Sequence, residues 1–180
     1  NTLEFLMMAG MELPLAVMAA IPEPWQEDKT MSRARRDMYR YYATLMEPWD
    51  GPAAILFSDG DILGAVLDRN GLRPARYYIT TDQRLILASE VGVLDLPPEL
   101  VAEKGRLGPG RMILADTRQG RVIRDWELKE SQAAKAPYGE WLDRELVGLA
   151  DLSLPNRRVE SRSREELQRL QKAFGYTYED

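Results

Sequence analysis

The residues best suited to chemistry in this sequence lie in one short segment, Leu67–Pro74, which reads Leu-Asp-Arg-Asn-Gly-Leu-Arg-Pro. Asp68, Arg69 and Arg73 could face an anionic or zwitterionic ligand, because arginine forks bind carboxylates through two parallel hydrogen bonds. The same pattern also predicts a polar turn between strands, since the Asn–Gly pair tolerates positive φ and the proline ends the loop. Asn–Gly turns are common, and the spacing alone does not decide between the two interpretations.

Most groups that carry covalent or metal chemistry are missing from the composition. The chain has no cysteine and no histidine, which excludes thiolate nucleophiles, the usual general base and the commonest metal ligand. Ser58, Ser89 and Ser131 therefore lack a histidine partner, and none lies in a nucleophile-elbow pattern. Asp59 and Asp61 flank a glycine, but the rest of a calcium loop is absent, so a hairpin turn is predicted there. We expect no catalytic residue and no metal ligand in this chain.

The overall composition limits the class of partner. Apolar residues make up 44% and charged residues 29% of the 180 residues, which is typical of a soluble globular domain. The net charge of -5 and the pI of about 5.0 argue against a nucleic-acid binder. No apolar run reaches membrane-spanning length, and there is no signal peptide. A reducing, cytoplasmic setting is the simplest expectation.

The hydrophobic pattern predicts helices, then antiparallel strands, then helices again, which is an α+β arrangement. The first helices are predicted at Leu3–Ala9, at Leu15–Ile21, and from a cap at Thr30 or Ser32 to about Met46. The predicted strands are Ala53–Phe57, Ile62–Leu67, Tyr77–Thr80, Leu85–Ala88, Met112–Ala115 and Val122–Ile123. Their nearly continuous apolar runs suit strands that are covered on both faces.

The remaining segments are predicted to be loops and short helices. Residues 89–110 are expected to be loop-like, with a short helical turn at Glu99–Glu103. Helices follow at Glu127–Lys135 and Gly139–Leu146. Residues 155–169 are rich in Arg, Glu and Ser and predict an exposed linker. Leu167, Leu170 and Phe174 then predict a short amphipathic helix, ending at Gly175, that could open a further domain.

Several runs, taken in order, resemble the glutaminase domain of the glutamate synthase large-chain family. They are Leu13–Glu23 with Trp25, Leu45–Ala53, Gly64–Pro74, Ala88–Val93, Gly105–Met112 and Pro137–Leu142. The run from Gln168 to Thr177 is similar to the start of that enzyme's central domain. The Asp-Arg-Asn-Gly-Leu-Arg-Pro run alone is also similar to class II amidotransferases at large. The resemblance implies that residues 1–148 form the carboxyl-terminal part of the glutaminase domain. It implies that residues 149–180 form a linker plus the start of the central domain.

The family implies a chemistry that the composition does not reveal. Its glutaminase domain is an N-terminal-nucleophile hydrolase with an α-β-β-α sandwich of mainly antiparallel strands, of which this chain would form part. The family's nucleophile is an amino-terminal cysteine whose own α-amino group serves as the base. Ammonia released from glutamine then adds to 2-oxoglutarate, and the product is reduced at FMN beside an iron–sulfur cluster.

Carried over residue by residue, the resemblance implies scaffold and no catalytic group. The family's cysteine, substrate arginine, substrate aspartate and oxyanion Asn-Gly would all precede Asn1, and the cofactor ligands would follow Asp180. The chain starts without methionine inside an apolar run, so we expect an inactive piece of a larger enzyme. Implied partners are the remaining domains, glutamine as parent substrate, and a small subunit or ferredoxin. Asp68, Arg69 and Arg73 remain the candidate site residues, in a pocket wall or a domain interface.

Two alternatives remain open at this stage. The chain could be the scaffold of another class II amidotransferase, such as the one that feeds purine synthesis. It could also be a non-catalytic binding module that lacks the nucleophile. The sequences flanking the chain would separate these alternatives.

Overall fold

The computed structural model describes residues 1–153 and 161–176 of the chain. The chain divides into two compact units, Asn1–Leu146 and Val147–Asp180. None of the described helices is both long and apolar enough to cross a membrane.

The first unit opens with three helices, α1 (Thr2–Met8), α2 (Leu13–Ala20) and α3 (Arg33–Ala43). Every residue of α2 is buried, and Pro14 occupies its first turn, where the missing amide of a proline loses no helical hydrogen bond. Ser32 caps α3, because its side chain accepts a hydrogen bond from the Arg35 amide at 3.3 Å. The helices expected in this region are therefore present, with α3 ending three residues earlier than expected.

Two antiparallel sheets follow. Sheet A has the order β1-β2-β6-β7 and sheet B the order β4-β3-β5. The strands of sheet A are β1 (Ala54–Ser58), β2 (Ile62–Leu67), β6 (Met112–Asp116) and β7 (Arg121–Arg124). Those of sheet B are β3 (Arg76–Thr80), β4 (Leu85–Ala88) and β5 (Val101–Arg106), the last preceded by a short 3-10 turn, η1 (Pro98–Leu100). The unit closes with α4 (Asp125–Ala133) and α5 (Tyr138–Glu145).

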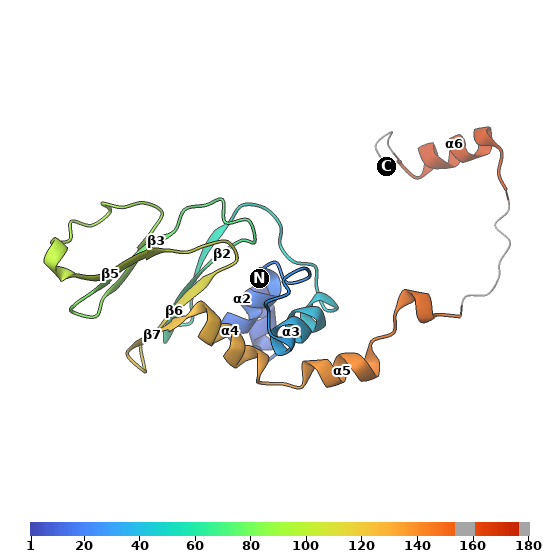
Figure 1. Ribbon diagram of the computed structural model, residues 1–180. Coiled ribbons are helices and arrows are strands. Elements are labelled where there is room, and N and C mark those ends of the chain that lie inside the picture. Colours follow the sequence, from blue (N-terminus) through green and yellow to red (C-terminus); the bar gives the residue numbers. More distant parts are fainter. Residues whose placement is uncertain (154–160, 177–180) are drawn as a thin grey trace. The chain divides into compact units, whose positions relative to one another are not determined.

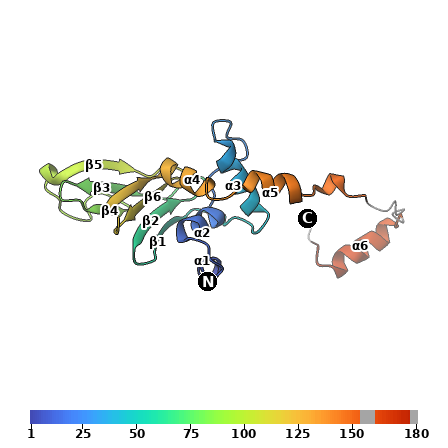
Figure 2. The ribbon, with the colours of Figure 1, turned by 90° about the horizontal axis from the view of Figure 1, so that it is seen from below.

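The first unit is layered as helices, sheet A and sheet B, as Figures 1 and 2 show. Alternate residues of sheet A supply the two cores, because successive side chains of a strand point to opposite faces. Phe57, Val66 and Met112 pack with the helices, whereas Ala65 and Leu67 pack with sheet B. Sheet A is therefore the shared central layer, and the predicted α+β class is confirmed.

Three expectations for individual segments were wrong. Residues 89–110 are not all loop, since they contain β5, and the expected helical turn at Glu99–Glu103 is a strand beyond Leu100. The strands are not all covered on both faces, because Leu56 is 66% and Leu63 is 53% exposed. These two side chains share the face of sheet A that packs sheet B, but they lie beyond the residues that form its core.

The second unit is described at residues 147–153 and 161–176. It contains a short 3-10 turn, η2 (Leu149–Asp151), and a helix, α6 (Arg164–Ala173). Ser163 and Glu166 form a reciprocal capping box at the start of α6. The expected linker at 155–169 is therefore helical from Arg164 onward, while its part at 155–160 lies outside the described residues. The amphipathic helix expected around Leu167 is present.

Candidate functional site

The candidate loop is held together by the carboxylate at its start. Asp68 directly follows β2 and is only 4% exposed. Its Oδ1 accepts a hydrogen bond from the Ala53 amide at 3.1 Å, and its Oδ2 accepts one from the Asn70 amide at 2.9 Å. The Asp68 carbonyl accepts two more, from the amides of Gly71 at 3.1 Å and Gly110 at 2.8 Å. Asp68 thus joins three chain segments through their backbone atoms.

The protonation of Asp68 follows from these contacts. Burial acts to raise its pKa, but the hydrogen bonds from the Ala53, Asn70 and Gly71 amides outweigh burial and lower the pKa below its ordinary value. The carboxylate is therefore ionised at neutral pH. Each carboxylate oxygen of Asp68 accepts a backbone hydrogen bond, and these bonds hold the loop in place.

Gly71 gives the loop its turn. It has a φ of +62°, and a Cβ there would lie 2.8 Å from the Pro109 Cα. Both the left-handed backbone and the close approach of the neighbouring loop require glycine. The turn interpretation of the Asn-Gly pair is therefore correct for the backbone.

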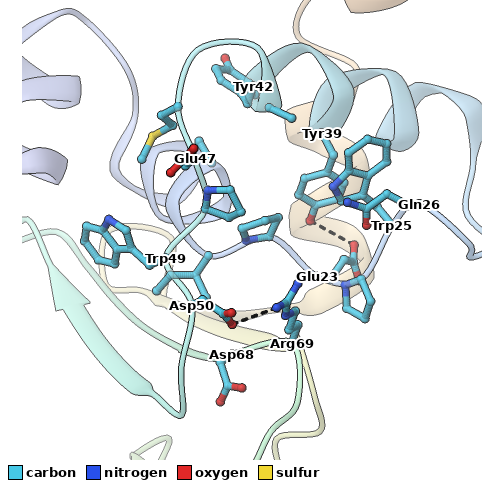
Figure 3. Close-up of a pocket in the computed structure, with 17 residues that line it drawn as sticks. Glu23, Trp25, Gln26, Tyr39, Tyr42, Glu47, Trp49, Asp50, Asp68 and Arg69 are labelled. Carbon is cyan, nitrogen blue, oxygen red and sulfur yellow. Dashed lines mark hydrogen bonds and ion pairs between the residues drawn. The ribbon is translucent and has the colours of Figure 1, made fainter. Parts of the chain in front are cut away.

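The two arginines of the loop have different surroundings. The Arg69 guanidinium lies 3.0 Å from the Asp50 carboxylate, and its side chain is 53% exposed. Figure 3 shows Arg69 directed toward Asp50, whereas the Asp68 carboxylate points away from both. Arg73 is exposed and forms no ion pair with any described residue. The structure therefore does not bring the side chains of Asp68, Arg69 and Arg73 into one ligand-facing group.

A pocket of about 420 Å³ lies beside this loop and is lined by Asp68 and Arg69, but not by Arg73. Its walls come from the segment after α2, from the end of α3 and from the approach to β1 (Figure 3). Besides Asp68, the lining includes several aromatic and acidic residues: Trp25, Tyr39, Tyr42, Trp49, Glu23, Glu47 and Asp50. Trp49 lines the pocket and is 44% exposed, and it belongs to neither of the two cores.

A buried charge cluster behind this pocket carries no signal in the sequence. Lys129 of α4 is 1% exposed, and its Nζ lies 2.9 Å from Glu23 Oε2 and 2.7 Å from Asp125 Oδ1. The same Nζ donates a hydrogen bond to the Gly110 carbonyl at 2.7 Å. Glu23 is also paired with Arg35 of α3. The cluster therefore joins α3, α4, the segment after α2 and the turn before β6.

Tyr39 completes this cluster at the pocket. Its hydroxyl donates a hydrogen bond to Glu23 Oε1 at 3.0 Å (Figure 3). Burial, and next the negative charge of Glu23, raises the pKa of Tyr39 well above its ordinary value. The phenol therefore remains a hydrogen-bond donor at physiological pH, and every charge of the cluster has a partner.

The groups described above can bind and position a ligand or a neighbouring segment. No group of three or more His, Cys, Asp or Glu side chains among them could hold a metal ion. The carboxylates at the pocket that are buried, Glu23 and Asp68, are both fully engaged. Buried ion pairs and hydrogen bonds therefore hold the inner wall of the pocket, and its exposed lining includes Glu47, Trp49, Asp50 and Arg69.

The match of the first unit to a known family gives the class of protein. Residues 1–141 match the sequence model of the family described as "Glutamine amidotransferases class-II". The chain belongs to this family, and the resemblance found in the sequence is confirmed.

The particular relatives are glutamate synthases. The chain is 51% identical to the "Glutamate synthase [NADPH] large chain" of Bacillus subtilis (strain 168), over 100% of this chain and 12% of that protein. It is 49% identical to the "Glutamate synthase [NADH]" of Schizosaccharomyces pombe, over 83% of this chain and 7% of that protein. It is 43% identical to the "Ferredoxin-dependent glutamate synthase 2" of Synechocystis, over 100% of this chain and 12% of that protein. The chain thus spans about an eighth or less of the length of these relatives.

Proposed function

We propose that this chain is part of a glutamate synthase large subunit, which hydrolyses glutamine and uses the ammonia to convert 2-oxoglutarate to glutamate. The observation that carries the proposal is the 51% identity to a glutamate synthase large chain along the whole of this chain. The α+β architecture and the family match over residues 1–141 support it.

Within that protein the chain acts as scaffold. It has no cysteine, so the thiol that attacks glutamine in this family comes from another segment. The contribution of this chain is the sheet A and sheet B framework and the pocket wall that its charge cluster braces. The 180-residue chain alone has no glutaminase activity.

The loop after β2 has a divided role in this proposal. Asp68 organises the backbone of the loop, and Arg69 with Asp50 forms the exposed wall of the pocket. Arg73 stands outside the pocket and is free to contact another domain of the same protein.

The cofactors implied for the parent enzyme, FMN and an iron–sulfur cluster, belong to other segments. Protein-bound iron–sulfur clusters are held by cysteine thiolates, and this chain has none. Among the relatives named above, the two with pyridine-nucleotide names are the more similar, at 51% and 49% against 43%. This difference favours a pyridine nucleotide over ferredoxin as electron source. We further propose a small subunit as partner and a cytoplasmic setting.

The test uses the full reading frame that contains this chain. The encoded protein, purified and supplied with glutamine labelled in the amide nitrogen, is expected to transfer the label to 2-oxoglutarate and form glutamate. Label transfer to a phosphoribosyl acceptor would instead assign the chain to another class II amidotransferase. Absence of any glutamine hydrolysis by the complete protein would favour a binding module.

A second experiment distinguishes the roles of Arg69 and Arg73 in the complete enzyme. Arg69→Ala is expected to raise the KM for glutamine or lower kcat if the pocket wall supports the glutaminase site. Arg73→Ala is expected to leave the KM for glutamine unchanged and to lower stability if it contacts another domain. A raised KM in Arg73→Ala alone would contradict this division of roles.

A further inference from the structure

The Asn70–Gly71 pair carries a chemistry that the proposed function does not use. It is the only Asn–Gly pair in the 180 residues, since Asn1 is followed by threonine and Asn156 by arginine. In such a pair the backbone nitrogen of the glycine can attack the side-chain carbonyl carbon of the asparagine. Glycine has no side chain to obstruct this attack and permits many backbone conformations. The pair is therefore a candidate site of spontaneous modification.

The reaction is deamidation, and it needs only water. A bond forms between the Gly71 nitrogen and Asn70 Cγ, the bond from Cγ to the side-chain nitrogen breaks, and ammonia leaves with the proton of the Gly71 amide. Water then opens the five-membered succinimide ring at either of its carbonyl groups. Opening at one carbonyl gives aspartate, and opening at the other gives isoaspartate, in which the main chain passes through the former side chain. Asn70 is exposed in this chain, so water can reach the ring.

The fold holds the pair in a conformation that opposes ring closure. The Gly71 amide donates a hydrogen bond to the Asp68 carbonyl at 3.1 Å, which closes a four-residue turn. Neither central residue, Arg69 or Asn70, has a positive φ, so the turn is of type I, in which the third residue has ψ near 0°. Ring closure brings the Gly71 nitrogen into line with the Cβ–Cγ bond of Asn70. The Asn70–Gly71 peptide must therefore rotate away from this ψ, and its hydrogen bond to Asp68 must break.

The side chain of Asp68 adds to this hold. Its Oδ2 accepts a hydrogen bond from the Asn70 amide at 2.9 Å, and its Oδ1 anchors it to the Ala53 amide at 3.1 Å. Hydrogen bonds to an ionised carboxylate are about twice as strong as those between neutral groups. The Gly71 nitrogen attacks after losing its proton, and a negative charge nearby opposes that loss. Asp68 thus disfavours both the rotation and the ionisation that the reaction requires.

A neighbouring turn restrains Gly71 from another side. A Cβ on Gly71 would lie 2.8 Å from the Pro109 Cα, so backbone of the turn before β6 packs directly against it. That turn is tied to the same carbonyl, because the Gly110 amide donates a hydrogen bond to the Asp68 oxygen at 2.8 Å. All of these restraints come from within the chain, whatever other segment covers the loop.

We propose that Asn70–Gly71 is a latent deamidation site and that the Asp68 carboxylate suppresses the reaction in the folded chain. Asp68 keeps the turn closed, and loss of its carboxylate lets the turn open locally. The products place a new carboxylate directly beside Asp68. Arg69, which pairs with Asp50 at the pocket wall, is bonded to the altered residue, so the modification changes the segment that carries this wall (Figure 3). The proposal is independent of the proposed function.

The test measures deamidation at Asn70 in the 180-residue chain. The chain is incubated at mildly alkaline pH and digested, and mass spectrometry of the peptides gives the fraction of aspartate and isoaspartate at position 70. We expect the folded chain to react at least about tenfold more slowly than the same chain unfolded in concentrated urea. This factor is the effect on a rate of one hydrogen bond that must break before the reaction.

One variant removes the carboxylate and leaves the backbone carbonyl in place. Asp68→Ala is expected to speed deamidation of the folded chain about tenfold, because the charge-assisted bond to the Asn70 amide is lost. Urea below the unfolding transition should leave this rate nearly unchanged, since a local opening exposes little surface. Circular dichroism checks that the variant is folded during the incubation, and Asp68→Asn replaces it if it is not.

The matched control lowers stability without touching the loop. Met38 is fully buried in α3 and does not line the pocket beside the loop. Met38→Ala opens a cavity in the helical core and destabilises the whole chain. It should nevertheless deamidate at Asn70 as slowly as the unmodified chain, because its turn is intact.

Three results would overturn the proposal. The first is an equal rate in the folded and the urea-unfolded chain. The second is a rate in the folded Asp68 variant equal to that of the unmodified chain. The third is equal acceleration by Asp68→Ala and Met38→Ala, which would show that the reaction proceeds through global unfolding and that the Asp68 carboxylate has no protective role of its own.

Discussion

At the scale of single residues, Lys129 has the most consequential environment in the chain. Its ammonium is 1% exposed and contacts Glu23, Asp125 and the Gly110 carbonyl. Removing one partner of a buried ion pair leaves the other charges without compensation, which costs about 3–5 kcal/mol. We therefore expect Lys129→Met to lower the free energy of unfolding by that amount in urea denaturation.

The control for this prediction is another lysine of similar reach. Lys135 pairs with Glu12, but the two side chains are 43% and 57% exposed. Exposed ion pairs contribute about 1 kcal/mol or less, so Lys135→Met should change the urea midpoint only slightly. Equal effects of the two substitutions would mean that the Lys129 cluster is open to water.

Asp68 gives a second prediction, through the dependence of stability on pH. Its pKa is lowered in the folded chain, so its stabilisation is fully present above the unfolded value of about 3.9 and is lost as pH falls through the folded value. Asp68→Asn places an amide where two backbone donors meet a carboxylate, which costs about 2 kcal/mol at neutral pH. This difference from the unmodified chain should shrink steadily below about pH 4.

Urea unfolding of the two proteins between pH 7 and pH 2.5 measures this effect. Asp50→Asn is the control, because Asp50 is 69% exposed in its pair with Arg69 and should have an effect within about 1 kcal/mol. A gap between the unmodified chain and Asp68→Asn that stays constant down to pH 2.5 would contradict the assigned pKa direction.

The sequence predicts some of this site and misses the rest for a physical reason. The loop from Asp68 to Pro74 stands out because its residue types are local signals of a turn. The Glu23–Lys129 pair gives no such signal, since its members are more than a hundred positions apart and each resembles an ordinary surface charge. Only the packing of α4 against the segment after α2 creates the pair.

At the scale of elements, the close approach of the turn before β6 to the segment after α2 gives a third prediction. Gly110 has a φ of +64°, and a Cβ there would lie 2.8 Å from the Glu23 Cβ and 3.0 Å from the Glu23 Cα. Gly110→Ala therefore combines left-handed strain of about 1–2 kcal/mol with a clash against backbone. We expect it to destabilise the chain by about 3 kcal/mol or more in thermal or urea unfolding.

The control variant, Gly120→Ala, measures the backbone strain without the steric clash. It has a φ of +63° with nothing within 4 Å of an added Cβ, so Gly120→Ala should show the strain alone, about 1–2 kcal/mol. Equal losses in the two variants would mean that the turn can move away from Glu23 and that the Lys129 cluster tolerates this movement.

Element prediction succeeds or fails according to where the apolar residues lie. β2 is predicted because Ile62–Leu67 is almost entirely apolar and lies between two cores. β5 is missed because Val101–Arg106 has charged residues at three of its positions and alternates half-buried with exposed side chains. Its strand conformation comes from pairing with β3, which is a contact between distant segments that composition does not record.

At the scale of the whole chain, the two units should separate without loss of stability in the first. Among the residues that the structure describes, the buried ones all lie between Leu13 and Leu142, and none at 147–153 or 161–176 is buried. The charge cluster and both cores are therefore complete within residues 1–146. We expect a chain ending at Leu146 to unfold in urea with a free energy within about 0.5 kcal/mol of the 180-residue chain.

The slope of unfolding free energy against urea concentration gives an independent check on the same pair of proteins. This slope scales with the surface that unfolding exposes, and an exposed second unit adds little to it, so the two slopes should be nearly equal. A lower midpoint together with a smaller slope in the shortened chain would contradict the inference that both cores are complete within residues 1–146.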